Sequence, residues 1–267
     1  MRPNFTKIGV VPLVFAVSGF NAAVADETAG TGKTFARSPQ EWKFVLGGGV
    51  QYAPEYEGSD KFDAVPLPFV SAKYGDRYTI SPFELGVTLS EAERYSFGVT
   101  LGYGGGRKPK DIDSGYLDGF QDIKSSAVLG GQLRYMLGQF KSYAVAKHYT
   151  GGTKGTTLAL GARTEMQATQ RISLYADASA TIADGNYMSG YFGVSASDSA
   201  ASGYATHTAE AGLQRLDLKI GGLYMMSQSI FLGGEIGLGQ LAGDAKDSPI
   251  VKDAFQPSVS LFVAYQF

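Results

Sequence analysis

The last nine residues of the chain, 259–267, constrain its fold more than any other segment. Val259, Leu261, Val263, Tyr265 and Phe267 are apolar or aromatic, and small or polar residues stand between them except at one position, Phe262. Side chains alternate between the two faces of a β-strand, so this pattern predicts a strand with one apolar face. A final strand of this kind ending on Phe is typical of bacterial outer-membrane β-barrels, and we interpret it as a barrel-assembly signal.

The N-terminus predicts export. A basic start, Arg2 and Lys7, precedes an apolar run at 8–20, and the small-x-small sequence Ala23-Val24-Ala25 follows. The run is too short to span a bilayer, so we expect residues 1–25 to be a cleaved signal peptide. An uncleaved membrane anchor is the alternative. The polar residues 26–41 are predicted to form a flexible periplasmic segment.

Composition excludes several classes of function. The chain has no cysteine, which excludes disulfide and thiolate chemistry. Removing the two basic residues of the predicted leader leaves 21 basic residues (23 − 2) against 25 acidic ones, a net charge of −4. That acidic balance excludes the basic surface by which proteins bind nucleic acid. No segment after the leader has eighteen consecutive apolar residues, so transmembrane helices are not expected.

From residue 42 onwards, alternating apolar residues predict β-strands separated by two kinds of connection. Short ones are expected at 75–76, 91–94, 138–140, 169–170 and 228–229, and longer ones at 53–64, 107–124, 184–211 and 244–254, with a small one at 151–154. Outer-membrane barrels place short turns in the periplasm and long loops outside. The two kinds alternate along the chain if it also turns at Pro82. We therefore predict a closed antiparallel transmembrane β-barrel of about twelve strands over 42–267.

Two alternatives to that architecture remain open. If residues 77–90 form one long strand, the barrel has ten strands. A soluble β-sandwich would also give short alternating strands, although it would not explain the leader, the terminal Phe and the unequal connections together.

If the apolar residues face lipid, the residues between them face the lumen. Five basic and five acidic side chains form this predicted lumen network: Lys43, Glu84, Arg134, Arg163, Glu165, Asp177, Arg215, Asp217, Lys219 and Glu235. A lumen of one sign would select ions of the opposite sign, whereas a balanced one predicts salt bridges across a narrow, closed interior. A specific pore lining is the alternative interpretation.

Candidate catalytic and metal-binding residues are few. The two histidines, His148 and His207, fall near a strand end and in a long loop, without a G-x-S-x-G or H-E-x-x-H motif. Loop aspartates gather at 111–122 and 244–253, without the spacing of a calcium loop. We therefore expect no catalytic residues, no cofactor and no metal, and we interpret the loop aspartates as solvated groups beside lipopolysaccharide and its cations. An enzyme at the barrel rim that uses either histidine is the least favoured alternative.

Several separated segments resemble the MipA/OmpV family of outer-membrane proteins. They are Tyr52–Asp60, which includes Pro54, Tyr56, Gly58, Ser59 and Asp60; Pro66–Phe69; Tyr74–Arg77; Leu101–Tyr103 with Gly106 and Arg107; Tyr191–Ser195; and Ala242–Val251, which includes Gly243, Asp244, Ser248 and Pro249. They occur in consistent order over most of 42–267. Most of them lie at predicted loops, where unrelated barrels share little.

The resemblance implies a location in the outer membrane of a Gram-negative bacterium, with outer-membrane lipid, lipopolysaccharide and the barrel-assembly machinery as partners. The family's namesake is described as a scaffold that joins a lytic transglycosylase and a murein synthase. Other members resemble adhesins or porin-like proteins. The expected function is therefore a non-enzymatic barrel that scaffolds peptidoglycan-remodelling enzymes. A narrow channel, or an adhesin acting through the long outer loops, is the alternative.

Overall fold

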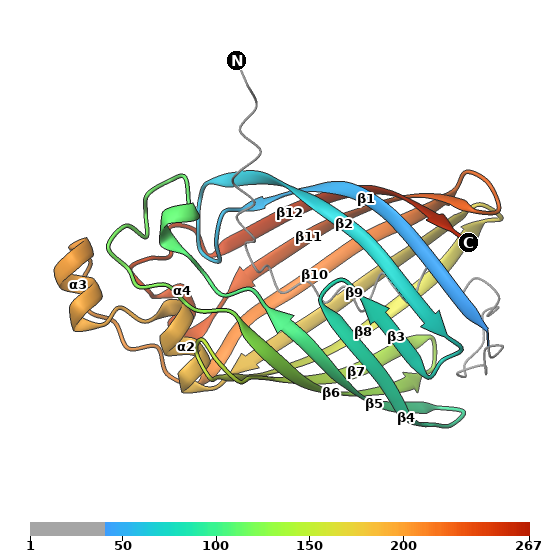
Figure 1. Ribbon diagram of the computed structural model, residues 1–267, viewed down its shortest axis with the longest axis horizontal. Coiled ribbons are helices and arrows are strands. Elements are labelled where there is room, and N and C mark those ends of the chain that lie inside the picture. Colours follow the sequence, from blue (N-terminus) through green and yellow to red (C-terminus); the bar gives the residue numbers. More distant parts are fainter. Residues whose placement is uncertain (1–40) are drawn as a thin grey trace, which may run out of the picture.

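The structure, a computed structural model, is described here for residues 41–267, where a closed antiparallel β-barrel of twelve strands forms (Figure 1). The predicted signal peptide 1–25 and all but the last residue of segment 26–41 lie outside the described residues. The strands are β1 (Trp42–Pro54), β2 (Phe62–Tyr74), β3 (Tyr78–Ser81), β4 (Glu84–Glu91), β5 (Tyr95–Gly104), β6 (Ser126–Leu137), β7 (Phe140–Tyr149), β8 (Thr156–Thr169), β9 (Ile172–Ala183), β10 (Gly212–Met225), β11 (Ile230–Leu241) and β12 (Phe255–Gln266). Each strand pairs with its neighbours in sequence, and β1 pairs with β12 to close the ring.

The outer face of the barrel is apolar. On the terminal strand, Leu261 is 56% exposed and points outward, whereas Phe262 is 3% exposed and points into the lumen. Aromatic side chains gather towards both ends of the outer face, with Trp42 and Tyr74 in contact at one end and Tyr52 and Phe62 stacked at the other. An apolar belt between aromatic girdles is the surface of a membrane-spanning barrel, and the predicted lipid face is confirmed.

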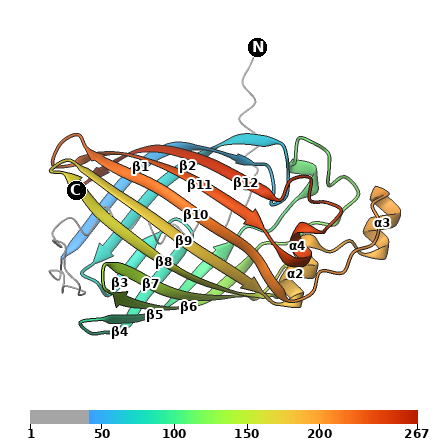
Figure 2. The ribbon, with the colours of Figure 1, turned by 180° about the vertical axis from the view of Figure 1, so that it is seen from behind.

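The two ends of the barrel differ as expected. Both ends of the barrel chain lie at the end that carries the short turns, which is therefore the periplasmic end (Figures 1 and 2). The turn at Pro82 exists, because β3 and β4 are separate strands, so the ten-strand alternative is wrong. Among residues 41–267, no helix is long and apolar enough to span a membrane.

At the opposite end, the long connections fold into a compact structure instead of extended loops. They contain the 3-10 helix η1 (Pro109–Asp111) and the helices α2 (Gly185–Phe192), α3 (Ala196–Ser202) and α4 (Gly243–Lys246). Figure 2 shows the helices beyond one end of the strands. We call the outer connections 55–61, 105–125, 150–155, 184–211 and 242–254 the lid. Buried aromatic side chains hold it together, which the sequence interpretation of solvated loops did not anticipate.

Candidate functional site

The strand register places all ten predicted lumen residues on the inner face of the barrel. On β8 to β10, for example, Arg163 lies opposite Asp177, and Asp177 lies opposite Lys219. Lys43 stands apart from the others, because its register partner near the periplasmic rim is another lysine, Lys73. The remaining nine occur at several levels of the lumen.

The outermost group joins the lid to the barrel wall. Arg215 of β10 places Nη1 2.6 Å from Oε1 of Glu57, a lid residue, and Nη2 2.6 Å from Oδ1 of Asp217. Gln214 also donates to Glu57, at 3.2 Å. All three charged side chains are at least three-quarters buried, so the paired charges interact with little screening by water.

A second group lies closer to the periplasm. Glu165 accepts from Nε of Arg163 at 2.7 Å and from Nζ of Lys141 at 3.2 Å. The Arg163 guanidinium sits 3.8 Å from the centre of the Tyr175 ring, and the Tyr175 hydroxyl donates to Glu235 at 2.6 Å. A continuous chain of charged and aromatic contacts therefore runs from β7 to β11.

Three further polar contacts involve other lumen-facing side chains of the barrel. The hydroxyl of Tyr143 donates to Asp177 at 2.8 Å, and Arg134 donates to Gln132 at 2.9 Å. Lys147 and Glu84 form a salt bridge of 3.0 Å between β7 and β4. Pairing of this kind offsets the cost of placing charges in a narrow interior.

An apolar cluster fills part of the lumen at the periplasmic side. It consists of Val45, Phe69, Leu223, Phe231, Phe262 and Ala264, all less than one-tenth exposed. The rings of Phe69 and Phe262 stack with their centres 5.0 Å apart. This cluster and the charged groups leave the interior substantially occupied by side chains.

Segments far apart in the sequence meet in the lid. The Tyr56 hydroxyl donates to the carbonyl of Ile250 at 2.8 Å, and the N–H of Gly58 donates to Oε1 of Gln256 at 2.9 Å. Gly58 has φ +102°, and a Cβ there would lie 2.6 Å from a methyl of Val251, so only glycine fits. The Ser248 hydroxyl donates to the carbonyl of Phe192. Three segments that carried the family resemblance, 52–60, 191–195 and 242–251, therefore form one joint.

Arg107 belongs to the same joint and is an unusual buried cation. Its Nη1 donates to the carbonyl of Tyr191 at 2.7 Å, and Nε has no hydrogen-bond partner among the described residues. Burial lowers the pKa of Arg107 below its ordinary value. Burial also raises the pKa of Tyr191 to about 12, and the nearby Glu57 adds to this shift, so the tyrosine hydroxyl stays neutral in the lid.

Asp184 caps the first lid helix, and replacing it with alanine should loosen α2. Its carboxylate accepts from the N–H of Tyr187 at 2.9 Å and from the N–H of Thr156 at 2.8 Å. Loss of an N-cap costs about 1 kcal/mol, and here a contact to β8 is lost as well. We expect protease to cleave within 184–211 faster in the folded Asp184→Ala protein than in the wild-type protein. Asp184→Asn retains one acceptor oxygen and should be cleaved more slowly than Asp184→Ala. Equal cleavage of Asp184→Ala and the wild-type protein would contradict the capping role.

The same cap should respond to pH. Burial raises the pKa of Asp184, but the hydrogen bonds from Tyr187 and Thr156 outweigh it and hold the pKa below its ordinary value. A depressed pKa contributes stability above the unfolded value of about 4, and this stability is lost as pH falls through the lower folded value. Protease sensitivity of the wild-type lid should therefore increase only in strong acid.

The contacts of the two histidines are those of structural residues. His148 contacts Thr156 at the outer end of β7, at 3.1 Å, and His207 contacts the carbonyl of Asp244 in the lid, at 3.0 Å. Within residues 41–267, no group of three or more His, Asp or Glu side chains has the arrangement of a metal site. Asp244 instead accepts from the N–H of Glu210 at 2.8 Å, which is a structural contact.

Several members of the lumen groups were missed by sequence reasoning. They are Glu57, Lys141, Tyr143, Lys147 and Tyr175. On β7 the outward residues Ser142, Ala144 and Ala146 are too small to mark the lipid face. The alternation of Lys141, Tyr143 and Lys147 with these small residues is the pattern that could have identified them as lumen-facing.

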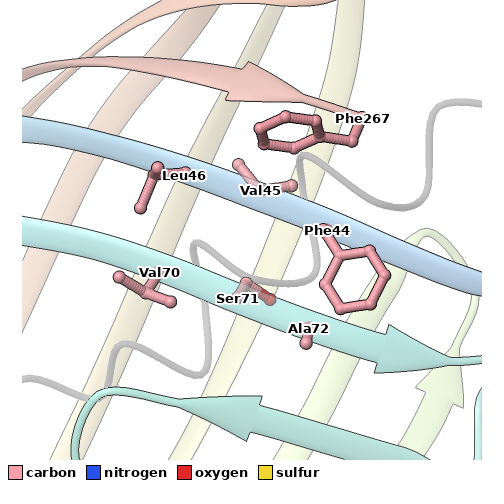
Figure 3. Close-up of a pocket in the computed structure, with 7 residues that line it drawn as sticks. All are labelled: Phe44, Val45, Leu46, Val70, Ser71, Ala72 and Phe267. Carbon is pink, nitrogen blue, oxygen red and sulfur yellow. The ribbon is translucent and has the colours of Figure 1, made fainter.

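An apolar groove of about 390 Å³ lies on the lipid-facing side of β1 and β2 (Figure 3). It is lined by Phe44, Val45, Leu46, Val70, Ser71, Ala72 and Phe267. No charged side chain lines it, and it belongs to the belt that contacts hydrocarbon.

Residues 46–267 match the family model described as MltA-interacting protein MipA. The chain belongs to this family. Together with the apolar belt and the closed barrel, membership places it in the outer membrane of a Gram-negative bacterium as a multi-pass β-barrel. A comparison with curated proteins finds no match.

Solved structures give distant likenesses. OmpT of Vibrio cholerae aligns over 85% of this chain and 97% of that protein, at 9% identity and a TM-score of 0.37. The COG4313 outer membrane channel from Pseudomonas putida F1 aligns over 86% and 96%, at 10% identity and a TM-score of 0.41. The outer membrane channel DcaP of Acinetobacter baumannii aligns over 85% and 96%, at 10% identity and a TM-score of 0.34. At these values the likeness carries no information on activity.

Proposed function

We propose that this MipA-family protein is a non-enzymatic outer-membrane scaffold for peptidoglycan-remodelling enzymes. The observation that carries the proposal is the family match over 46–267, whose description names an interaction with MltA. The occupied lumen supports it, because an interior filled by salt bridges and stacked rings favours a surface role over free diffusion of solutes. The partners we propose are a lytic transglycosylase and a murein synthase.

The surface available for such partners is the periplasmic rim. Arg77, Arg94 and Arg171 occupy three of its short turns, and all three side chains are exposed. A stable interface buries about 800 Å² on each partner, which is large for turns of two to four residues. We therefore propose that residues 26–41 contribute to the contact together with these arginines.

The test is capture of purified partners by the purified barrel in lipid nanodiscs. The wild-type protein should retain a lytic transglycosylase and a murein synthase, and the double variant Arg94→Glu/Arg171→Glu should retain much less, because reversing rim charges slows association and weakens binding. Lys108→Glu/Lys110→Glu is the matched control, since it also reverses two exposed positive charges, in the lid on the opposite membrane side. A version lacking residues 26–40 tests the second part of the proposed contact.

Retention of neither enzyme by the wild-type protein would overturn the scaffold function. Equal retention by the rim variant and by Lys108→Glu/Lys110→Glu would leave a scaffold but reject the rim arginines as its binding surface.

A narrow channel is the second candidate, and partial solvent exposure within the lumen favours it. The side chains of Lys141, Glu165 and Glu84 are 28–29% exposed although they face inward. Planar-bilayer recordings separate the two functions. Conductance of the wild-type protein with ion selectivity that changes on Lys141→Gln would support a channel, and absence of conductance would reject it.

A further inference from the structure

The wall of the barrel is incomplete on its outer half. β2 pairs with β1 along its whole length, Trp42–Pro54 against Phe62–Tyr74, but it pairs with β3 only at Ala72–Tyr74. The β3–β4 hairpin turns back at Pro82 and Phe83, and β2 continues towards the lid without a strand on that side (Figure 1). We call the region bounded by Phe62–Ser71, the Pro82–Phe83 turn and the outer end of β5 the side opening.

The side opening lies at the depth of the membrane hydrocarbon. Phe62, at its outer end, stacks on Tyr52 of the outer aromatic girdle, and Tyr74, below its inner end, contacts Trp42 of the periplasmic girdle. The part of β2 that pairs with β1 but not with β3 has ten residues, or about 33 Å of strand. The 105–125 connection, which follows β5, packs on other lid segments through Ile112 and Leu117.

Two prolines lie on the edge of β2 that faces the side opening. Pro66 and Pro68 pair with Val50 and Gly48 of β1 in an unbroken register, which is possible only if their nitrogens point away from β1 and towards the side opening. The centre of the edge therefore lacks two N–H donors. An added strand would need those donors, so this edge is a poor template for pairing with another chain.

From Ala64 to Val70 the side chains of β2 are apolar on both faces, and the polar residues Asp63 and Ser71 stand on either side of this stretch. Pro66, Pro68 and Val70 point outward with the other lipid-facing residues, and the alternating residues Val65, Leu67 and Phe69 point into the lumen. Elsewhere the inner face carries both the charged groups and the apolar cluster described above. Phe69 leads directly to the apolar cluster around Phe262.

We propose that the side opening admits an acyl chain of an outer-leaflet lipid, which lies against Val65 and Leu67. Molecules that reach the opening laterally are membrane lipids, because it is framed by the lipid-facing belt. The inner apolar side chains match hydrocarbon. This inference is independent of the proposed scaffold function, since it concerns the membrane-embedded wall and not the periplasmic rim.

Tryptophan quenching by brominated lipid tests the proposal. The chain has a single tryptophan, so Trp42→Phe gives a dark background. In that background, Leu67→Trp and Val65→Trp place an indole on the inner face beside the opening, Ala159→Trp places one on the inner face of β8 behind an intact wall, and Leu133→Trp places one on the lipid face. Each variant is reconstituted in vesicles of phosphatidylcholine brominated in mid-chain and in unbrominated vesicles.

We expect the lipid-facing Leu133→Trp and the inward Leu67→Trp and Val65→Trp to lose most of their fluorescence in brominated vesicles, and Ala159→Trp to keep it. Two positions on β2 are included so that failure of one variant to fold still leaves a result. Quenching at neither β2 position beyond that of Ala159→Trp would overturn the proposal. Protection of both, together with cross-linking of the barrel to a second polypeptide along β2, would show that a protein strand and not lipid fills the opening.

Discussion

Replacing Phe262 with alanine should lower the free energy of unfolding by about 3–5 kcal/mol, the usual cost of removing a buried aromatic ring. Phe262 is 3% exposed and stacks on Phe69 inside the lumen. The neighbouring strand cannot fill the space, because the residue facing the ring is Gly233, where even a Cβ would overlap the ring atoms. The change should therefore leave a cavity. Urea unfolding of the protein in lipid vesicles, followed by the fluorescence of Trp42, measures the loss.

Phe97→Ala is the matched control for that prediction. Phe97 is 41% exposed on the outer face of β5, so its removal leaves a space that lipid chains can occupy. We expect a smaller loss of stability than for Phe262→Ala. Equal losses for the two variants would mean that the lumen cluster contributes nothing beyond ordinary apolar contact, and would contradict the cavity argument.

The lipid face was predictable from the sequence because hydrocarbon imposes a period of two on every strand. Large apolar residues such as Leu129, Leu133 and Leu137 therefore mark the outward direction without knowledge of the fold. Phe262 stood out as an exception to this pattern, and the structure gives the reason. Gly49 and Gly233 on the strands either side leave room on the inner face for one large ring.

The lid was less predictable, because its contacts join residues that are distant in sequence. Glu57 and Arg215 are separated by 158 positions, and no local pattern connects them. Helix α2 did leave a signal. Asp184 stands three residues before Tyr187, and the buried side chains Tyr187, Met188, Tyr191 and Phe192 repeat at the spacing of one helical face.

The side opening could not be read from hydrophobic alternation, since strand pairing is a non-local property. Two prolines in Pro66-Leu67-Pro68 were nevertheless visible in a predicted strand, and prolines in a sheet are confined to edges or bulges. A fully closed barrel has no sheet edge, so two prolines in one of its strands indicate that part of that strand lacks a partner on one side. The early turn at Pro82 supplies it, because the hairpin that should cover β2 ends after four residues.

Replacing Arg215 with methionine should destabilise the attachment of the lid to the barrel. This guanidinium is shared by Glu57 of the lid and Asp217 of β10, whose side chains are 21% and 16% exposed. Its removal leaves two partly buried carboxylates without a cation and close enough to repel each other. Breaking a buried ion pair in this way costs about 3–5 kcal/mol. The loss should appear both in urea unfolding and as faster protease cleavage within 184–211 and 242–254.

Lys246→Ala provides the control for the lid prediction, because its salt bridge to Asp247 is also in the lid but is 50% and 63% exposed. An exposed pair contributes about 0–1 kcal/mol, so cleavage and unfolding should change little. Suppose that the lid of Arg215→Met proves as resistant to protease as the lid of Lys246→Ala. The joint of segments 52–60, 191–195 and 242–251 and the buried aromatic side chains would then be sufficient to hold the lid. If instead the lid loosens while barrel strands stay protected from hydrogen exchange, lid and barrel unfold as separate units, and the charges around Arg215 are what couples them.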